Sequence, residues 1–389
     1  MPARLGALLD KNLWIVFGVA LMAVLRADSI TPAFPGMAQA LGVTSQQTAL
    51  LISIFALPSI FLTPLLGMLA DRWGRKKILA PSLLLFGLAG GACALARDFN
   101  LLLGLRLLQG VGAASLSMLN ITLVADLYQD ERRTIAMGYN TSMRSTGAMI
   151  FPLIGGALAG IGWFYPFLLP LLAIPTALLV WFRLNTPETN LRTNFLAYLG
   201  GAFQSMRSWQ VVQIFLAGSL IFMVMFGAYL GYFAFLLSEK FQAPPSLIGL
   251  LIAGRPLITT IIASQLGRIV RRWREEQLIK SALLLFAVAL AFIPLAPSLM
   301  WIGIITALLG TAEGLYWPAN HSLLGRLAPI EHRAGFMAFN DMVMKIGQTS
   351  GPALMGVVAL AGGIDVTFYV SAILLLILFA ILSIRFPST

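Results

Sequence analysis

The sequence carries little charge, one cysteine and two histidines. Charged residues make up 11% of the 389 residues and hydrophobic residues 59%, whereas soluble domains have about 25% charged residues. The composition therefore excludes an ordinary water-soluble globule. The single Cys93 excludes an internal disulfide, and His321 and His332 are too few and too isolated for a metal site. Because the sequence also has no G-x-x-x-x-G-K-[ST] phosphate loop and no nucleophile constellation, we expect neither an enzyme nor a bound metal or cofactor.

Long apolar stretches dominate the chain instead. A membrane-spanning helix needs about 20 mostly apolar residues, and in lipid such a segment must satisfy its own backbone hydrogen bonds, which a helix does. The sequence therefore predicts an all-α membrane protein with twelve transmembrane helices. The predicted spans are residues 13–34, 47–70, 78–96, 100–126, 134–158, 162–183, 211–237, 247–267, 277–295, 298–325, 334–360 and 366–385.

The positive charge is distributed unevenly along the chain. The net charge is +11, and most lysines and arginines fall in loops on one side of the predicted membrane, whereas only Arg97 and Lys240 fall in the opposite loops. By the positive-inside rule, both termini are cytoplasmic. The short loops and termini suit a multi-pass protein of a bacterial inner (plasma) membrane. The basic excess is thus a topology signal, and it requires no nucleic-acid partner.

The two halves of the sequence are related by an offset of 200 residues. Residues that recur 200 positions later include Leu50, Leu51, Ile52, Leu66, Gly67, Arg72, Trp73, Glu131, Arg133, Met137, Asn140, Gly147, Pro152 and Gly156. Equivalent positions are six predicted helices apart, so the copies share one membrane orientation and are related by a pseudo-two-fold axis. This predicts an N-terminal half (1–183), a cytoplasmic linker (184–210) and a C-terminal half (211–389), with a cavity between the halves.

The loop after the second predicted span carries the most specific motif. It reads Gly67-Met-Leu-Ala-Asp71-Arg72-Trp-Gly74-Arg75 and resembles the G-x-L-a-D-r-x-G-r-k loop of the major facilitator superfamily. The resemblance covers essentially the whole chain, and it implies a transporter that works by alternating access.

The charges of this loop can act as a latch at the cytoplasmic ends of the helices. Asp71 can lie against the positive end of a neighbouring helix, and the basic cluster, with Arg72 and Arg75, can pair with a carboxylate such as Asp126. In the second copy Arg271 and Arg274 take the places of the Asp and the second Gly. We therefore expect only the first copy to form the gating latch. The alternative interpretation of this motif is a solvated basic loop without a gating role.

Two ionisable residues in the first half are candidates for proton coupling. Arg106, in Arg106-Leu-Leu-Gln109-Gly110, resembles the intramembrane arginine that the family uses in proton coupling; a structural ion pair is the alternative. Asp28 falls about 15 residues into the first span, and the run Asp28-x-x-x-Pro-Ala-x-Pro resembles bacterial drug:proton antiporters of the Bcr/CflA type. A permanent salt bridge of Asp28 with Arg26 or Arg106 is the alternative.

Glycines and prolines in the spans 134–158 and 334–360 predict close packing and bending. Gly147, Pro152 and Gly156 resemble the antiporter motif G-x-x-x-G-P-x-x-G-G, although Phe151 replaces a central Gly and weakens that inference. Small residues at this spacing let helices approach closely, and a proline bends a helix. Gly351 and Pro352 repeat the pattern, so packing alone can explain both copies.

The remaining intramembrane ionisable and aromatic residues predict a substrate cavity. Its candidates are Arg26, Arg144, Arg255, Tyr232, Tyr316 and Lys345, with Glu313 as a second proton carrier beside Asp28. We expect Glu313 to pair with Lys345 and expect no acid between Arg144 and Arg255, so that the cavity is net positive. For the aromatic residues, core or lipid-facing packing is the commoner alternative.

These features predict proton-coupled export of small amphiphilic compounds by a monomer that binds a small-molecule substrate and protons within the lipid bilayer. The excess of buried cations leaves a transporter of organic anions, phosphorylated metabolites or lipids as the alternative. A lipid scramblase or a non-transporting membrane receptor is the alternative from another class.

Overall fold

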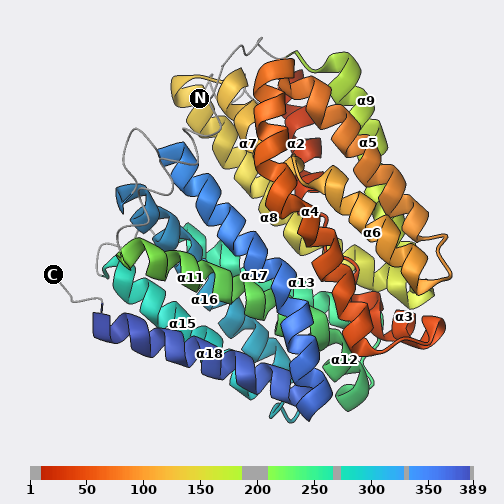
Figure 1. Ribbon diagram of the computed structural model, residues 1–389, viewed down its shortest axis with the longest axis vertical. Helices are drawn as coiled ribbons and strands as arrows, with labels where there is room; N and C mark the ends of the chain where they lie inside the picture. The colour runs from red at the N-terminus through yellow and green to blue at the C-terminus, as the bar shows by residue number, and fades with distance from the viewer. Residues whose placement is uncertain (1–9, 186–208, 266–272, 328–332, 386–389) are drawn as a thin grey trace. The chain divides into compact units, whose positions relative to one another are not determined.

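The computed structural model describes residues 10–185, 209–265, 273–327 and 333–385, and every regular element in these ranges is a helix (Figure 1). The chain divides into two compact units. The first consists of Met1–Val43 with Ile54–Asn194, and the second of Thr44–Ser53 with Phe195–Thr389. The predicted boundaries of the halves and linker stay a prediction, and most of the predicted linker (186–208) lies outside the described residues.

The first unit contains the helices drawn from red to yellow-green in Figure 1. They are α2 (Lys11–Val24), η1 (Thr31–Ala33), α3 (Phe34–Leu41), α4 (Ser45–Trp73, its first turns grouped with the second unit), α5 (Arg75–Cys93), α6 (Phe99–Ala113), α7 (Leu116–Leu127), α8 (Asp130–Ile161), η2 (Tyr165–Leu172) and α9 (Ala173–Arg183).

The second unit contains the helices drawn from green to blue. They are α11 (Trp209–Val224), the π-helix η3 (Met225–Tyr229), α12 (Leu230–Phe241), α13 (Pro245–Ser264), α15 (Glu275–Phe292), α16 (Leu299–Leu327), α17 (Arg333–Gly362) and α18 (Ile364–Arg385).

The predicted all-helical membrane fold is confirmed. Among the described residues, nine helical segments are long and apolar enough to cross a membrane, so the count of twelve spans stays a prediction. The nine segments are Ser45–Trp73, Arg75–Cys93, Phe99–Leu127, Asp130–Ile161, Tyr165–Arg183, Val211–Phe241, Pro245–Ser264, Leu299–Leu327 and Ile364–Ile384.

Four predicted spans are not single α-helices. The span 100–126 divides into α6 and α7, the span 162–183 begins with the 3-10 helix η2, and the span 211–237 contains the π-helix η3. The span 13–34 is interrupted after Val24 and resumes as η1 and α3. A hydropathy pattern reports only how long an apolar segment is, and these interruptions leave that length unchanged.

The interruption between α2 and α3 has a local cause. Pro32 and Pro35 lack the backbone N–H that would continue α2 through this segment, and each lies in the first turn of the element that follows the interruption, η1 and α3. The hydroxyls of Ser29 and Thr31 donate to the carbonyls of Arg26 and Ala27, each over 3.0 Å, which satisfies backbone acceptors inside the turn. Pro35 then lies in the first turn of α3, where its missing N–H costs nothing.

The cores of both units are held by helices that approach through glycine. In the first unit a Cβ on Gly147 would lie 2.7 Å from Val24 on α2, and a Cβ on Gly155 would meet the backbone carbonyl of Ser29. In the second unit, Gly347 and Gly351 of α17 face the backbone of Ser219 and Met223 in the same way. The predicted packing role of this motif is therefore confirmed in both copies.

The prolines of the same motif, Pro152 and Pro352, lie inside α8 and α17 and are buried, as is Gly156. The bends that we predict at these prolines stay a prediction.

Helix α6 offers a matched test of this close packing. A Cβ on Gly110 would meet the backbone carbonyl of Phe55 on α4, whereas Gly104 of the same helix has no neighbouring atom within 4 Å. Overpacking costs about 1–3 kcal/mol, and alanine favours a helix over glycine by about 1 kcal/mol. Gly110→Ala should therefore lower the apparent melting temperature of the purified protein, and Gly104→Ala should leave it unchanged or raise it. Equal melting temperatures of the two variants would contradict the packing described for α4 and α6.

Candidate functional site

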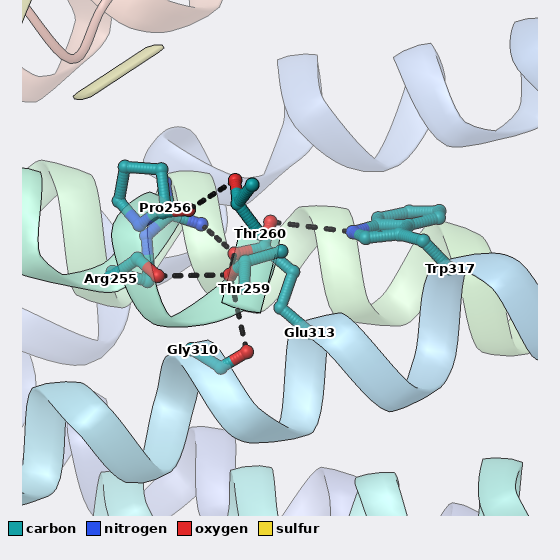
Figure 2. Close-up of polar contacts among 7 residues, drawn as sticks. All are labelled: Arg255, Pro256, Thr259, Thr260, Gly310, Glu313 and Trp317. Carbon is teal, nitrogen blue, oxygen red and sulfur yellow. Dashed lines mark hydrogen bonds and ion pairs between the residues drawn. The ribbon is translucent and has the colours of Figure 1, made fainter. Parts of the chain in front are cut away.

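A buried ion pair in the second unit joins α13 to α16. Arg255 Nη1 lies 2.8 Å from Glu313 Oε2, and the two side chains are only 10% and 19% exposed (Figure 2). The other carboxylate oxygen, Oε1, accepts the indole N–H of Trp317 over 3.3 Å. Both oxygens of the carboxylate therefore have donors, which is the condition under which a charge can be held between helices.

Thr259 lies at the centre of this cluster, one turn after Arg255 on α13. Its hydroxyl is 2.9 Å from the Arg255 carbonyl, 3.1 Å from the Gly310 carbonyl and 3.1 Å from Glu313 Oε2. A hydroxyl has one proton, so it donates to one of these acceptors at a time. The threonine can thus follow a change at the carboxylate by turning its O–H toward a backbone carbonyl.

Two glycines bring α13 and α16 close enough for this pair to form. A Cβ on Gly310 would lie 2.6 Å from the carbonyl oxygen of Arg255, and a Cβ on Gly314 would lie 2.9 Å from that of Thr259. Glycines four residues apart let two helix backbones approach in a membrane. Glu313 lies between these glycines in the sequence, so the same approach that packs the helices places its carboxylate on Arg255.

Aromatic rings from α11, α16 and the π-helix lie beside the pair. The Arg255 guanidinium lies over the ring of Tyr229, 5.5 Å from its centroid, and Phe222 packs edge-on against Trp317 at 5.3 Å. Tyr229 ends the π-helix Met225–Tyr229, and single π-helical turns are frequent at functional sites. Tyr232 and Tyr316 are completely buried in this unit, in agreement with the packing alternative for these two residues.

The structure corrects the pairing that we expected for Glu313. Its ion pair is with Arg255, whereas the described hydrogen bond of Lys345 goes to Gln348 over 2.8 Å. The charge of Arg255 is thus balanced by Glu313, and the expectation that no acid lies between Arg144 and Arg255 stays a prediction. Arg255 and Glu313 are on different helices, and the sequence does not show that Gly310 brings those helices together. Arg144, the other cation of the predicted cavity, lies half-buried on α8 in the first unit.

The intramembrane arginine of the first unit is in a different environment. Arg106 is 1% exposed, its Nη1 donates to Gln109 Oε1 over 2.6 Å, and its guanidinium lies 4.3 Å from the centre of the Phe55 ring. Asp28 and Arg26 are half-buried in the interruption between α2 and α3. The expectation that Asp28 lies within a helix is therefore wrong, because α2 ends at Val24 and the next helical element begins at Thr31. A broken helix is where transporters place ion and substrate sites.

The predicted latch of the first unit has the expected pairing. Gly74, with φ of +97°, ends α4 and starts α5, so Arg75 begins the new helix. Arg75 lies 3.0 Å from Asp71 and also pairs with Asp126, and its side chain is 9% exposed. Arg72, by contrast, is exposed, and a Cβ on Gly67 would lie 2.6 Å from Met118. The pairing of Arg75 with Asp126 is confirmed, and a role in gating stays a prediction.

The second unit has an ion pair at the equivalent positions, with the signs exchanged. Glu275 stands 200 residues after Arg75, Arg326 stands 200 residues after Asp126, and the two side chains pair. Glu275 also accepts the Ser322 hydroxyl over 2.6 Å. The second copy therefore also carries an ion pair at this end of its helices, which the comparison of Arg271 and Arg274 with the acid and glycine of the first loop does not show. The expectation that only the first copy acts as a gating latch stays a prediction.

Sequence reasoning also missed three polar contacts. Thr259 and Trp317 support Glu313, as described above. In the first unit, the Tyr128 hydroxyl donates to Asp10 over 2.6 Å. Burial, together with this hydrogen bond and the negative charge of Asp10, raises the pKa of Tyr128 above its ordinary value, so the phenol stays neutral through the physiological range. Of these contacts, only that of Thr259 had a signal in the sequence. Thr259 follows the intramembrane Arg255 by four residues, and a hydroxyl at that spacing can hydrogen-bond to the carbonyl of the preceding turn.

No group of three or more histidine, cysteine, aspartate or glutamate side chains that could hold a metal occurs among the described residues. His332 lies outside them.

The sequence matches the model of the Major Facilitator Superfamily over residues 16–238 and 214–389, which is nearly the whole chain. The chain belongs to this superfamily. It is therefore a multi-pass membrane transporter for small molecules and not an enzyme, as the loop Gly67 to Arg75 led us to expect. The drug-exporter resemblance also has support among curated relatives.

Two relatives from Bacillus subtilis (strain 168) illustrate this. The chain is 28% identical over 346 residues to multidrug resistance protein 2, and the match covers 86% of each chain. It is 34% identical over 164 residues to the bacillibactin exporter, but this match covers only 40% of the chain and 41% of the exporter.

Solved structures of low identity share the fold. The nucleoside transporter NupG aligns with a TM-score of 0.84 at 14% identity, over 97% of this chain and 100% of that one. The human organic anion transporter MFSD10 aligns with a TM-score of 0.69 at 21% identity, over 95% and 98% of the two chains. At these identities the likeness concerns the fold alone.

The two sign-exchanged ion pairs differ in burial, which gives a matched prediction. Arg75→Gln leaves Asp71 and Asp126 beside each other without their cation, at side-chain exposures of 23% and 22%. Arg326→Gln removes a cation that is 60% exposed, and exposed pairs contribute about 0–1 kcal/mol. We expect Arg75→Gln to lower the melting temperature of the purified protein by several degrees and Arg326→Gln to change it by a degree or less. The assignment fails if the two variants melt together or in the reverse order.

Proposed function

We propose that the protein exports small amphiphilic compounds, including drugs, by alternating access and in exchange for protons. The names of the relatives support export: multidrug resistance proteins 2 and 1 of Bacillus subtilis match 86% and 90% of this chain. We further propose that a single chain forms the transporter, and that it lies in a bacterial inner membrane with both termini in the cytoplasm. The basic loops on one side of the spans support this orientation.

The observation that carries proton coupling is the Arg255–Glu313 pair. It is an acid held between membrane helices by one cation, one indole N–H and one hydroxyl. Intramembrane acids of this kind are costly and mark ion and proton paths. A proton that binds Glu313 Oε2 cancels the attraction for Arg255 and turns an acceptor into a donor, and Thr259 can rotate to a backbone carbonyl. Protonation thereby loosens the contact between α13 and α16.

The free energy of proton entry is sufficient for this work. One charge moving down the membrane potential supplies about 2.3 kcal/mol per 100 mV, which corresponds to an accumulation ratio of about fifty for an uncharged compound exchanged for one proton. Export of a monovalent cation in the same exchange is driven by the pH gradient alone. We assign the proton carriers to Glu313 and Asp28, and a modulating role to Arg106, whose buried guanidinium holds Gln109. The latch of Asp71, Arg75 and Asp126 serves as the gate element in this scheme.

An anion transporter is the weaker alternative. It rests on an excess of buried cations, and the charge of Arg255 is balanced by Glu313. The resemblance to a human organic anion transporter is at 21% identity and concerns the fold. A scramblase or receptor has no supporting observation in the site.

Glu313→Gln tests the proton carrier directly. Glutamine keeps a carbonyl acceptor for Trp317 and Thr259 but cannot bind or release a proton. In proteoliposomes with an imposed pH gradient, we expect the wild type to move tetraphenylphosphonium, and the variant to lose this gradient-driven flux down to the level of empty liposomes. Binding of the same cation to the purified variant should be retained.

The control for this experiment is Asp365→Asn, which removes an exposed carboxylate from the first turn of α18. It should leave the flux unchanged. Gradient-driven flux that survives in Glu313→Gln would remove Glu313 from the proton path, and absence of flux in the wild type, for a panel of cationic, neutral and anionic amphiphiles, would contradict drug export itself.

A further inference from the structure

Three buried positions differ in character between the two units. At positions 200 residues apart, the first unit has Leu13, Phe17 and Leu116, and the second has Gln213, Ala217 and Tyr316. All six side chains are buried. The repeat has therefore exchanged two hydrophobic residues for hydrogen-bonding ones and a large residue for a small one.

Two asparagines recur in both units, and the first of them is bonded in only one unit. In the first unit, Asn120 donates to the Val16 carbonyl over 2.9 Å, and Asn140 donates to Asn120 over 2.8 Å. Their counterparts Asn320 and Asn340 are 0% and 1% exposed. Both polar atoms of the Asn320 amide have no hydrogen-bond partner in the part of the chain that the structure describes. Asn340 donates to the sulfur of Met344, and its carbonyl oxygen, like that of Asn140, has no described partner.

Gln213, like Asn320, is a buried amide without a described hydrogen-bond partner. It is 2% exposed, and neither its amide nitrogen nor its carbonyl oxygen has a partner among the described residues. We refer to Gln213, Asn320 and Asn340 as the amide cluster. The hydroxyl of Tyr316, which is one turn before Asn320 on α16, also has no described partner.

Two of the three helices of the cluster, α11 and α16, line a small pocket together with α15 and α18. Ala217 of α11 and Asn320 of α16 both line it, together with Ile214, Ile279, Leu323 and Leu382, and Glu276 and Lys280. Gln213 is one turn before Ala217 and thus on the same face of α11. A Cβ on the next residue, Gly218, would lie 3.5 Å from the Tyr316 hydroxyl and 3.4 Å from the sulfur of Met344, toward which the Asn340 amide points over 3.9 Å.

Burying these amides destabilises the second unit unless another molecule supplies their hydrogen bonds. A buried polar group without a partner destabilises the fold, and the first unit shows that the same fold accommodates leucine at position 13 and a fully bonded asparagine at position 120. The pocket walls are mostly apolar, and its two charged residues, Glu276 and Lys280, are of opposite sign. Such a site has no preference for a cation or an anion and favours a group that both donates and accepts.

We propose that the amide cluster is a substrate subsite that binds an uncharged amide or hydroxyl group of the transported compound. The proposal rests on the function proposed above and adds to it a class of substrate: neutral amphiphiles that carry hydrogen-bonding groups. Its place is within the second unit, between α11, α16 and α17. The aliphatic side chains beside the cluster bind the apolar part of the same compound.

A pair of probes separates this subsite from export in general. Chloramphenicol is uncharged and carries an amide and two hydroxyls, whereas tetraphenylphosphonium has no hydrogen-bonding group. Each of Gln213→Leu and Asn320→Leu should raise the half-saturating concentration of chloramphenicol in proteoliposome transport about 5–10-fold, as expected for one lost hydrogen bond. The same variants should change the half-saturating concentration of tetraphenylphosphonium less than about twofold. Ala217→Phe, which introduces the residue of the first unit, should exclude chloramphenicol by filling the pocket.

A stability measurement keeps the result interpretable. Asn120→Leu removes a bonded amide and leaves Asn140 unpartnered, so it should lower the melting temperature, whereas Asn320→Leu removes an unbonded one and should not. Transport of both probes unchanged in Gln213→Leu and Asn320→Leu would overturn the subsite and leave trapped water as the partner of the amides. Export of tetraphenylphosphonium by the wild type without export of chloramphenicol would overturn it as well. Failure of the wild type with every probe of the panel would instead reject the proposed function.

Discussion

A charge or amide placed between apolar helices must find its partner inside the same helix bundle, because lipid offers none. The second unit shows how this constraint is met. Glu313 receives a guanidinium, an indole N–H and a hydroxyl, and these come from two helices that touch through Gly310 and Gly314. The ion pair therefore depends on the close contact of the two helix backbones. Without the glycines, the carboxylate of Glu313 would be too far from Arg255 to be neutralised.

The same constraint explains where the helices depart from regularity. The interruption after Val24 exposes backbone acceptors, and the hydroxyls of Ser29 and Thr31 satisfy two of them. Gly155 then allows α8 to pack directly on this non-helical backbone. A motif that resembles a transport signature thus has a structural task in this unit, and its copy around Gly347 and Gly351 has the corresponding task against α11.

Sequence patterns predicted what depends on length, charge and repetition. Apolar stretches gave the helical membrane fold, the Gly67 to Arg75 loop gave the family, and the acidic partner of Arg75 followed from the need to compensate a basic loop. The pairing of Glu313 could not be read in the same way, because it depends on which helices approach closely and on which faces. The interruption near Asp28 was also missed, since its residues keep the segment apolar enough to count as one span. The state of Asn320 was equally hidden, because the identical residue at position 120 is fully bonded.

The exchanged signs of Arg75–Asp126 and Glu275–Arg326 limit how this chain can have diverged from its internal repeat. Recombination between repeated gene segments can copy a residue from one half into the other. If only one of these four residues were copied, two cations or two anions would face each other at the end of a helix pair. Only a transfer that includes both positions, which lie 51 residues apart, keeps the charges complementary.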